Sequence, residues 1–299
     1  MKALGKYIDH RALAAIQGFA FDPKGLVEGN QAGAHKSPFH GFSVEFAGHR
    51  EYIPGDDTKH IDWVVYYKRD RYMIKQYEAE TNLTCQIVLD ASESMLVGST
   101  GMTKLDYAAY VAVSLAYLIT RVRDKVGLGI FDDRVIDYIP PSNSLASTYT
   151  LSRVIEELTP RRQTDISKPL MDLASRFGRR QIVVLLSDFL CDISQMRDAL
   201  GRLRYDNHEV VAIQVLDPQE LDFPFDGRLR LVGLEGYPTL KLRPRELRRR
   251  YLEKMEQRRR ELRELCEKNN VEYVLADTSH SVKELLFAYL TSRLTHISR

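Results

Sequence analysis

From Cys85 onward, short and almost continuously apolar runs alternate with longer stretches whose apolar positions recur at helical spacing. Continuous apolar runs are typical of strands buried on both faces, and strands that alternate with helices form parallel sheets. The pattern therefore predicts a doubly wound α/β domain. Its predicted strands are Gln86–Asp90, Val126–Phe131, Arg134–Ile139, Gln181–Leu186, Val210–Val215 and Val271–Leu275, and its predicted helices are Leu105–Arg121, Ser147–Leu158, Ser167–Phe177, Ser194–Tyr205, Arg245–Lys268 and Ser281–Arg293.

One segment departs from this alternation, just before the long helix. Leu229–Val232 and Thr239–Leu242 flank turn-forming residues and predict a β-hairpin inserted at residues 226–242. Because most hairpins pack against their own domain, a structural role is favoured over a binding surface.

The first third of the chain has a different pattern. Ile8–Phe19 predicts a short helix, and Phe21–Phe39, rich in Gly, Pro, Asn and His, predicts a loop. Short runs typical of strands follow between turn signals, at Ser43–Phe46, Asp62–Tyr67 and Met73–Tyr77. We therefore predict an N-terminal helix and β-rich lobe over residues 1–84, followed by a mostly parallel α/β domain over residues 85–299.

Composition adds limits on partners and compartment. The 299 residues carry a formal net charge of only +2, which provides no strong attraction to nucleic acid or anionic lipid. The three cysteines lie far apart, so we expect small buried side chains in a reducing compartment. The N-terminus lacks signal-peptide features, and the longest apolar stretch, Ala108–Ile119, is shorter than the ~20 residues that cross a bilayer. We expect a cytoplasmic protein without a membrane span.

Two predicted strands lead into aspartate, Asp90 and Asp188. In a doubly wound sheet, ligands bind outside the carboxyl ends of the strands. Asp90 opens a D-x-S-x-S pattern with Ser92 and Ser94, and alternate residues of an extended segment project the same way. The resulting carboxylate and hydroxyl oxygens suit Mg²⁺, Mn²⁺ or Ca²⁺ rather than zinc. Taken alone, the pattern favours a serine-rich helix cap over a cation site.

A loop threonine, Thr164, precedes a predicted helix and completes a larger pattern. Together these parts resemble the metal-ion-dependent adhesion site of von Willebrand factor A domains. The resemblance implies one divalent cation, Mg²⁺ before Mn²⁺ or Ca²⁺, with a coordination position left for a carboxylate of a partner protein. Its inner and water-mediated shells would be formed by Asp90, Ser92, Ser94, Thr164 and Asp188. The glycine expected after the last aspartate is Phe189 here, which alters the local loop.

The segments Gly41–Phe46, Arg50–Asp57 and Ile61–Trp63 are similar to the signature of a bacterial family called domain of unknown function 58. Members of this family place such a β-rich segment directly before a von Willebrand A-like domain. The resemblance implies an accessory or adaptor protein that works with a MoxR-type AAA+ ATPase. It implies no reaction, and this chain resembles the branch without N-terminal membrane helices.

The predicted helix Arg245–Lys268 is rich in arginine, a feature that can indicate nucleic acid binding. Glutamates are interleaved with the arginines, and an apolar stripe runs along the helix at helical spacing. This pattern favours a helix that packs on the core and has one solvated face, so we expect no nucleic acid partner. The stripe consists of Leu247, Tyr251, Met255, Leu262 and Cys266.

The sequence favours a non-enzymatic, metal-dependent protein-binding module, because it contains no G-x-S-x-G, H-E-x-x-H or P-loop motif. A metal-dependent phosphoester hydrolase is an alternative, in which Asp90 and Asp188 hold the cation and Glu93 or Asp165 acts as general base. A scaffold protein with a non-functional metal site is a third interpretation.

Overall fold

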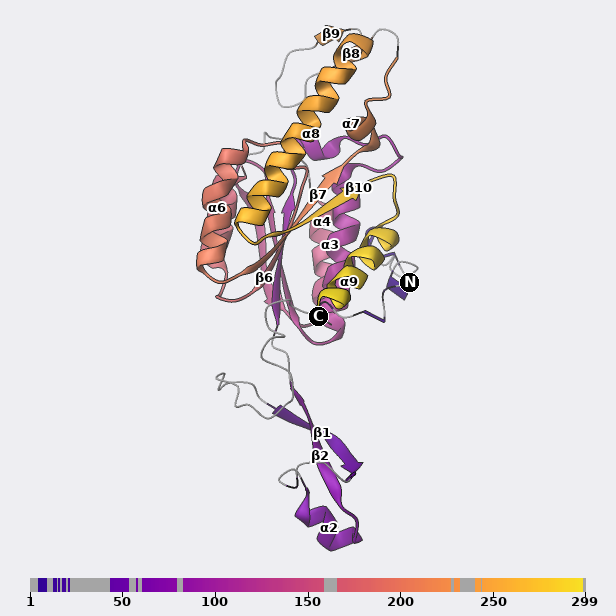
Figure 1. Cartoon of the computed structure of the whole chain (residues 1–299), viewed down its shortest axis with the longest axis vertical. Helices are drawn as coiled ribbons and strands as arrows, with labels where there is room; N and C mark the ends of the chain where they lie inside the picture. The colour runs from indigo at the N-terminus through magenta and orange to yellow at the C-terminus, as the bar shows by residue number, and fades with distance from the viewer. Residues whose placement is uncertain are drawn as a thin grey trace. The chain divides into compact units, whose positions relative to one another are not determined.

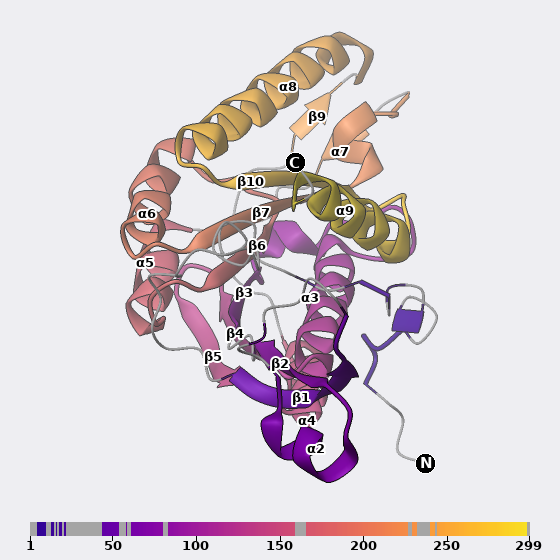
Figure 2. The ribbon, with the colours of Figure 1, turned by 60° about the horizontal axis from the view of Figure 1, so that its bottom comes forward.

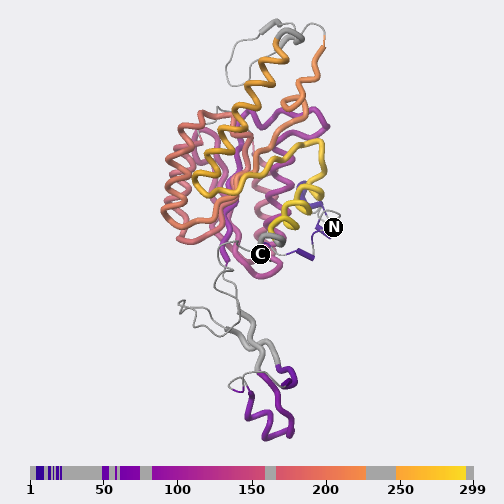
Figure 3. Tube along the Cα trace, in the orientation of Figure 1, coloured from indigo at the N-terminus to yellow at the C-terminus, as the bar shows by residue number. Residues whose placement is uncertain are grey.

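The computed structural model describes residues 5–9, 13–14, 16, 18–19, 21, 44–53, 58, 61–79, 83–158, 166–226, 229–231, 240–242 and 244–297. The chain forms two compact units, one made of Glu28–Asn82 and the other of Met1–Val27 together with Leu83–Arg299. Figure 3 follows the trace from the indigo N-terminus to the yellow C-terminus, both of which belong to the larger unit.

A six-stranded sheet forms the centre of the larger unit, in the order β10-β7-β6-β3-β4-β5. Neighbouring strands are parallel except for β4 and β5, which are antiparallel. All predicted strands of this unit are present, and their bounds are β3 Thr84–Asp90, β4 Lys125–Phe131, β5 Val135–Ser142, β6 Ile182–Ser187, β7 Glu209–Leu216 and β10 Glu272–Asp277.

Helices cover both faces of this sheet, as Figures 1 and 2 show. One face carries α3 (Lys104–Arg121), α4 (Leu145–Glu156) and α9 (Val282–Ile297). The other carries α5 (Ser167–Arg176), α6 (Ile193–Tyr205) and α8 (Pro244–Lys268). Two short helices, η3 (Glu93–Leu96) and α7 (Pro218–Asp222), were not predicted. The predicted fold class, a von Willebrand A-like α/β fold with a mostly parallel sheet, is confirmed.

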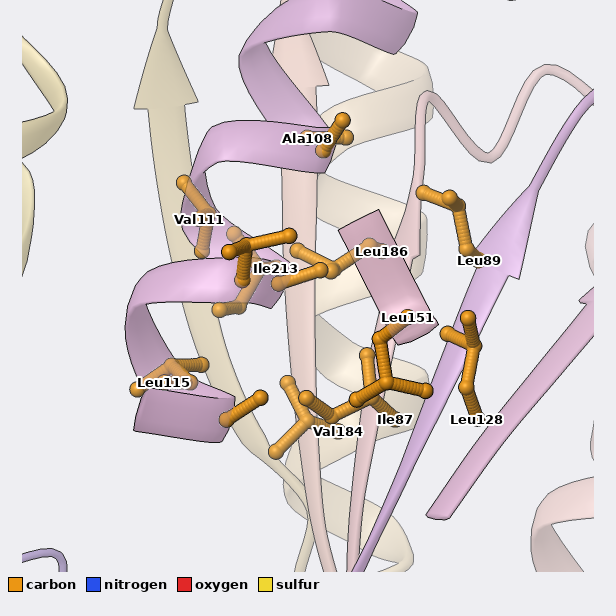
Figure 4. Close-up of a cluster of buried hydrophobic side chains, with 14 of the residues drawn as sticks. Ile87, Leu89, Ala108, Val111, Leu115, Leu128, Leu151, Val184, Leu186 and Ile213 are labelled. Carbon is orange, nitrogen blue, oxygen red and sulfur yellow. The ribbon is translucent and has the colours of Figure 1, made fainter. Parts of the chain in front are cut away.

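The two helical layers explain why the strands are almost continuously apolar. Ile87 and Leu89 of β3 pack into the core beneath α3, whereas Val88, between them, packs into the core beneath α5 and α6. All three side chains are fully buried, and each contributes about 1.5–3 kcal/mol by leaving water. Figure 4 shows part of the first core, where Val111 and Leu115 of α3 lie among side chains from the sheet.

The N-terminal segment packs on the larger unit, which differs from the predicted boundary that grouped residues 1–84 with the lobe. The hydroxyl of Tyr7 donates to Asp106 of α3 at 2.9 Å, and its ring meets Tyr110 edge-on at 5.3 Å. Phe19 contacts Phe287 of α9 in the same way, with ring centroids 5.2 Å apart. The helical layer of the larger unit gives these aromatic side chains an apolar surface to cover.

Within the predicted helix Ile8–Phe19, the residues Leu13, Ala14 and Ile16 are helical. Its residues at 10–12, 15 and 17 lie outside the described part of the chain, as does the predicted loop Phe21–Phe39 apart from Phe21 itself.

In the smaller unit, β1 (Val44–Glu51) and β2 (Met73–Ala79) pair as an antiparallel sheet, so the predicted strands at Ser43–Phe46 and Met73–Tyr77 are confirmed. The predicted strand Asp62–Tyr67 is wrong, because this segment forms the helix α2 (Trp63–Arg69).

Capping explains why α2 is a helix. The Asp62 carboxylate accepts hydrogen bonds from the backbone N–H groups of Val64 and Val65, at 3.0 and 3.3 Å. Asp70 then ends the helix in a left-handed conformation and donates its N–H to the carbonyl of Tyr66. These terminal hydrogen bonds outweigh the β preference of the Trp-Val-Val-Tyr-Tyr run.

The predicted hairpin has its strands at β8 (Leu229–Leu231) and β9 (Leu240–Leu242), which pair antiparallel. The apolar stripe of α8 joins the core at Leu262 and Cys266, whereas Leu247 near its start is exposed. All three cysteines are buried and unpaired, as predicted. No helix within the described ranges has the length and apolar character needed to cross a membrane.

Candidate cation-binding site

The parallel pairing of β3 and β6 brings two aspartates to one edge of the sheet. Leu89 pairs with Leu186, so Asp90 at the end of β3 lies beside the residues that end and follow β6. Asp90 and Asp188 are both fully buried. Two carboxylates in one buried region need compensating positive charge or protons.

The serines of the D-x-S-x-S pattern lie on the turn that follows Asp90. The N–H of Ser92 donates to Oδ1 of Asp90 at 2.9 Å, and the hydroxyls of Ser92 and Ser94 are 3.1 Å apart. The fully buried Met95 anchors the short helix η3 that carries Ser94. Asp90, Ser92 and Ser94 are therefore gathered locally, whereas Thr164 lies outside the described residues.

Ser187, the last residue of β6, holds the Asp90 carboxylate from the other side. Its hydroxyl donates to Oδ2 of Asp90 at 2.5 Å and accepts the N–H of Phe189 at 2.9 Å. Burial and, after it, the nearby charge of Asp188 raise the pKa of Asp90 to about 7, and the hydrogen bonds from Ser187 and Ser92 limit this rise. A cation bound next to Asp90 would favour the ionised form of this carboxyl group.

The most unusual feature of the region is a fully buried lysine, Lys104, in the first turn of α3. Its Nζ donates to Oδ2 of Asp188 at 2.8 Å and to Oε1 of Glu220 at 2.7 Å. Burial alone lowers the pKa of Lys104, but the two carboxylates outweigh this effect, so the net direction is upward. The two ion pairs thus favour the ammonium form of Lys104 next to Asp188.

The remaining oxygens of these two carboxylates are also bound. Oδ1 of Asp188 accepts the N–H of Leu190 at 3.0 Å, and Oε2 of Glu220 accepts the N–H of Asp217 at 3.0 Å. Glu220 therefore caps α7 with one oxygen and binds Lys104 with the other.

Neither Lys104 nor Glu220 was predicted from the sequence as a residue of this site. A signal was present for Lys104, because a lysine in the first turn of a helix faces the positive end of the helix dipole and needs a specific partner to offset that repulsion. Glu220 stands three residues after Asp217, a capping-box spacing that predicts the start of a helix but not an ion pair.

Phe189, which stands where the von Willebrand A resemblance expects glycine, has a φ of 54°. This left-handed conformation costs a residue with a side chain about 1–2 kcal/mol relative to the usual backbone. The Phe189 ring is buried in the core beneath α5 and α6, and this burial offsets the strain. The loop thus keeps the conformation that a glycine would adopt.

The donor set is chemically suited to a hard divalent cation. Within the described ranges, no group of three or more His, Cys, Asp or Glu side chains has a metal-binding arrangement, so a cation at this edge would depend on the serine hydroxyls as well as on the carboxylates. Hydroxyl and carboxylate oxygens are the ligands that Mg²⁺, Mn²⁺ and Ca²⁺ prefer. Of the general bases considered for hydrolysis, Glu93 lies on η3, and Asp165 lies outside the described residues.

The fold and this strand edge define the class of the larger unit, a von Willebrand A-like α/β domain. The family profile described as "Protein of unknown function DUF58" matches residues 48–261. The chain belongs to this family.

Two mycobacterial proteins are among the relatives of similar sequence. The chain is 27% identical over 235 residues to "Uncharacterized protein Rv1480" of Mycobacterium tuberculosis (strain ATCC 25618 / H37Rv), covering 78% of this chain and 74% of the relative. "Uncharacterized protein Mb1516" of Mycobacterium bovis matches with the same values.

Among solved structures, the chain is similar to an aerotolerance-related membrane protein from Bacteroides fragilis NCTC 9343, with a TM-score of 0.48, 18% identity and coverage of 70% of this chain and 99% of that one. The hypothetical protein BatB from Bacteroides thetaiotaomicron gives a TM-score of 0.45 at 17% identity, with 72% and 98% coverage. The SpRpn10 VWA domain gives 0.39 at 12% identity, with 69% and 94% coverage.

Proposed function

We propose that the larger unit is a cation-dependent protein-binding module without catalytic activity of its own. In this proposal Asp90, Ser92 and Ser94 hold a divalent cation, Mg²⁺ before Mn²⁺ or Ca²⁺, and Asp188 and Thr164 complete its surroundings. When bound, the cation supplies an electrophilic position for a carboxylate from a partner protein. The observation that carries the proposal is the meeting of two buried carboxylates with two adjacent hydroxyls at the carboxyl edge of β3 and β6.

The surface next to these residues supports a protein partner over a small phosphoester. Leu96 lies two residues beyond Ser94, and Leu190 lies two residues beyond Asp188; they are 42% and 36% exposed. Exposed leucines beside a charged centre are typical of a protein interface, in which apolar contacts surround one polar anchor. On the resemblance stated above, we propose a MoxR-type AAA+ ATPase as the partner.

The first test is calorimetric titration of Mg²⁺ and Mn²⁺ into metal-stripped protein, with Asp90→Ala as the test variant. Asp172→Ala is the control, because Asp172 is an exposed aspartate on α5 that pairs with Arg176. We expect saturable binding in the wild type and in the control, and none in Asp90→Ala. Equal binding in all three proteins would refute the proposed site.

The second test measures binding of a purified MoxR-type ATPase in Mg²⁺ and after chelation. The proposal requires binding in Mg²⁺ that is lost on chelation and in Asp90→Ala. If a divalent cation stimulated hydrolysis of p-nitrophenyl phosphate, and Asp188→Asn abolished this activity, the result would support the phosphoester hydrolase and contradict the proposal of a binding module without catalytic activity.

A further inference from the structure

The long helix α8 differs between its two halves in charge and in burial. Residues 243–252, at its start, contain five arginines and one glutamate, whereas residues 253–268 contain six basic and five acidic residues. The carboxyl half packs on the core through Leu262, Leu265 and Cys266. In the amino half, which extends past the end of the sheet in Figure 1, none of the described side chains up to residue 254 is buried.

One side of the amino half forms a surface that we call the basic flank, made of Leu247, Arg250 and Lys254. These residues are spaced i, i+3 and i+7, so they lie on the same side of the helix. All three side chains are exposed. On the adjacent side, Tyr251 packs against Phe223 at the end of α7, with ring centroids 4.6 Å apart. This contact fixes the side of α8 that faces α7 and leaves the basic flank open to solvent.

The charges of the basic flank do not stabilise the helix that carries them. Arg250 and Lys254 are like charges at i, i+4, a spacing that brings them together on the helix surface and lowers helix stability. The neighbouring carboxylate, Glu253, pairs with Arg249 at 3.7 Å. Neither Arg250 nor Lys254 forms an ion pair with any residue in the part of the chain that the structure describes.

The carboxylates around α7, which packs next to this half of α8, do not balance these charges either. Asp217 caps α7, and Glu220 binds Lys104 at 2.7 Å. Asp222 and Asp226 are exposed, and within the described ranges neither forms an ion pair with the basic flank. A partner that carries negative charge would therefore meet two cations that no described carboxylate of this chain holds.

The basic flank leads toward the candidate cation site. Arg258 lies one turn after Lys254, and its guanidinium donates to the backbone carbonyls of Phe189, at 3.3 Å, and of Cys191. These carbonyls belong to the loop that follows β6. Residues 250–258 span ~12 Å along the helix axis. A bound segment of that length would reach from the basic flank to the carboxyl edge of the sheet.

We propose that the basic flank of α8 is a docking surface for an acidic segment of a partner protein. Carboxylates of the segment bind Arg250 and Lys254, and an apolar side chain of the segment covers Leu247. Charge complementarity of this kind fixes the partner and speeds its association. The proposal goes beyond the cation-dependent binding proposed above and does not require it, because no residue of the candidate cation site belongs to the basic flank.

A protein segment fits this surface better than nucleic acid or a lipid bilayer. Nucleic acid neutralises its phosphates with an extended set of cations, whereas the exposed Glu253 and Glu256 interrupt the positive charge along α8. A helix that lies on a bilayer buries a broad apolar face, and Leu247 is the one exposed large apolar side chain among the described residues of α8. Two cations beside one leucine match a short acidic segment with a single apolar contact.

The test measures binding of fluorescein-labelled decaglutamate to the metal-stripped full-length chain in EDTA, by fluorescence anisotropy. We expect saturable binding that weakens as ionic strength rises. The double variant Arg250→Gln with Lys254→Gln should bind at least tenfold more weakly, because it removes both cations that the peptide carboxylates contact. Since both side chains are exposed, the variant should keep the wild-type unfolding midpoint in thermal circular dichroism.

A matched control is the double variant Arg260→Gln with Lys268→Gln. It also removes two exposed positive charges from α8, but from the carboxyl half of the helix. The net charge changes by the same amount in both double variants, so general attraction would affect them equally. We expect the control to bind decaglutamate within about threefold of wild type.

Three results would overturn the proposal. The first is no saturable binding of decaglutamate to the wild type, and the second is equal weakening in the two double variants. The third is tighter binding of a deca-thymidine oligonucleotide that is lost in Arg250→Gln with Lys254→Gln, since it would assign the surface to nucleic acid. Asp90→Ala should bind decaglutamate as the wild type does, so failure of the basic flank and failure of the cation site are separate outcomes.

Discussion

Replacing Asp90 with asparagine should stabilise the cation-free protein at neutral pH while abolishing its stabilisation by Mg²⁺. The pKa of Asp90 is raised from 3.8 to about 7, chiefly by burial and then by Asp188. Each pKa unit corresponds to about 1.4 kcal/mol, so the shift of roughly three units represents at most about 4 kcal/mol. This energy is the cost of keeping a buried Asp90 ionised.

The direction of the pH dependence follows from proton binding. Because the folded-state pKa is above the unfolded value, the native protein holds an extra proton between about pH 4 and pH 7. The free energy of unfolding of metal-stripped wild type should therefore fall as pH rises through this window. Asp90→Asn removes the titrating group, and its amide can still accept from the Ser92 N–H and donate to the Ser187 hydroxyl. The free energy of unfolding of this variant should therefore change less with pH than that of the wild type.

The assay is urea unfolding of metal-stripped protein, followed by far-UV circular dichroism. Tryptophan fluorescence is unsuitable, because the single tryptophan, Trp63, belongs to the smaller unit. Mg²⁺ at a hundred times its dissociation constant should add about 2.7 kcal/mol to the wild type at neutral pH and nothing to Asp90→Asn. The reasoning is wrong if both proteins show the same pH dependence without metal, or if Mg²⁺ stabilises both equally.

Two further predictions concern the fold. Arg293→Met should lower the free energy of unfolding by about 3–5 kcal/mol in urea titrations, because it leaves Glu209 of β7 and Glu272 of β10 without their buried cationic partner. The control, Arg176→Met, removes one side of an exposed ion pair and should change the free energy of unfolding by less than about 1 kcal/mol. Gly127→Ala should destabilise by about 1–3 kcal/mol, since a Cβ there would lie 2.4 Å from a buried glutamine oxygen and 3.0 Å from a carbonyl of β5. Gly201→Ala on α6 should stabilise the protein by about 0.4–1 kcal/mol, because an added Cβ there would have no other atom within 4 Å. If thermal unfolding showed Gly127→Ala to be more stable than Gly201→Ala, this packing argument would be wrong.

The α/β fold could be predicted from sequence because its signal is repeated and local. Each central strand must be apolar on both faces, so β6, whose residues are all buried, is visible as a continuous run without knowledge of its neighbours. Asp90, Ser92 and Ser94 are close in the chain, and their hydrogen bonds span only two residues. The helix α2 was missed because two hydrogen bonds to the Asp62 side chain outweigh five residues of β-preferring character.

The tertiary structure alone decided which distant residues meet. Pairing of β3 with β6 places Ser187 against Asp90 across 97 positions of sequence, and α3 and α7 bring Lys104 and Glu220 together across 116. No local pattern specifies such contacts, because the charge of a lysine in a helix is equally compatible with solvent until the sheet and α7 enclose it. The sequence by itself determined the central strands and long helices of the larger unit and the chemical type of the candidate ligands. The enclosed packing decided which distant charged side chains meet.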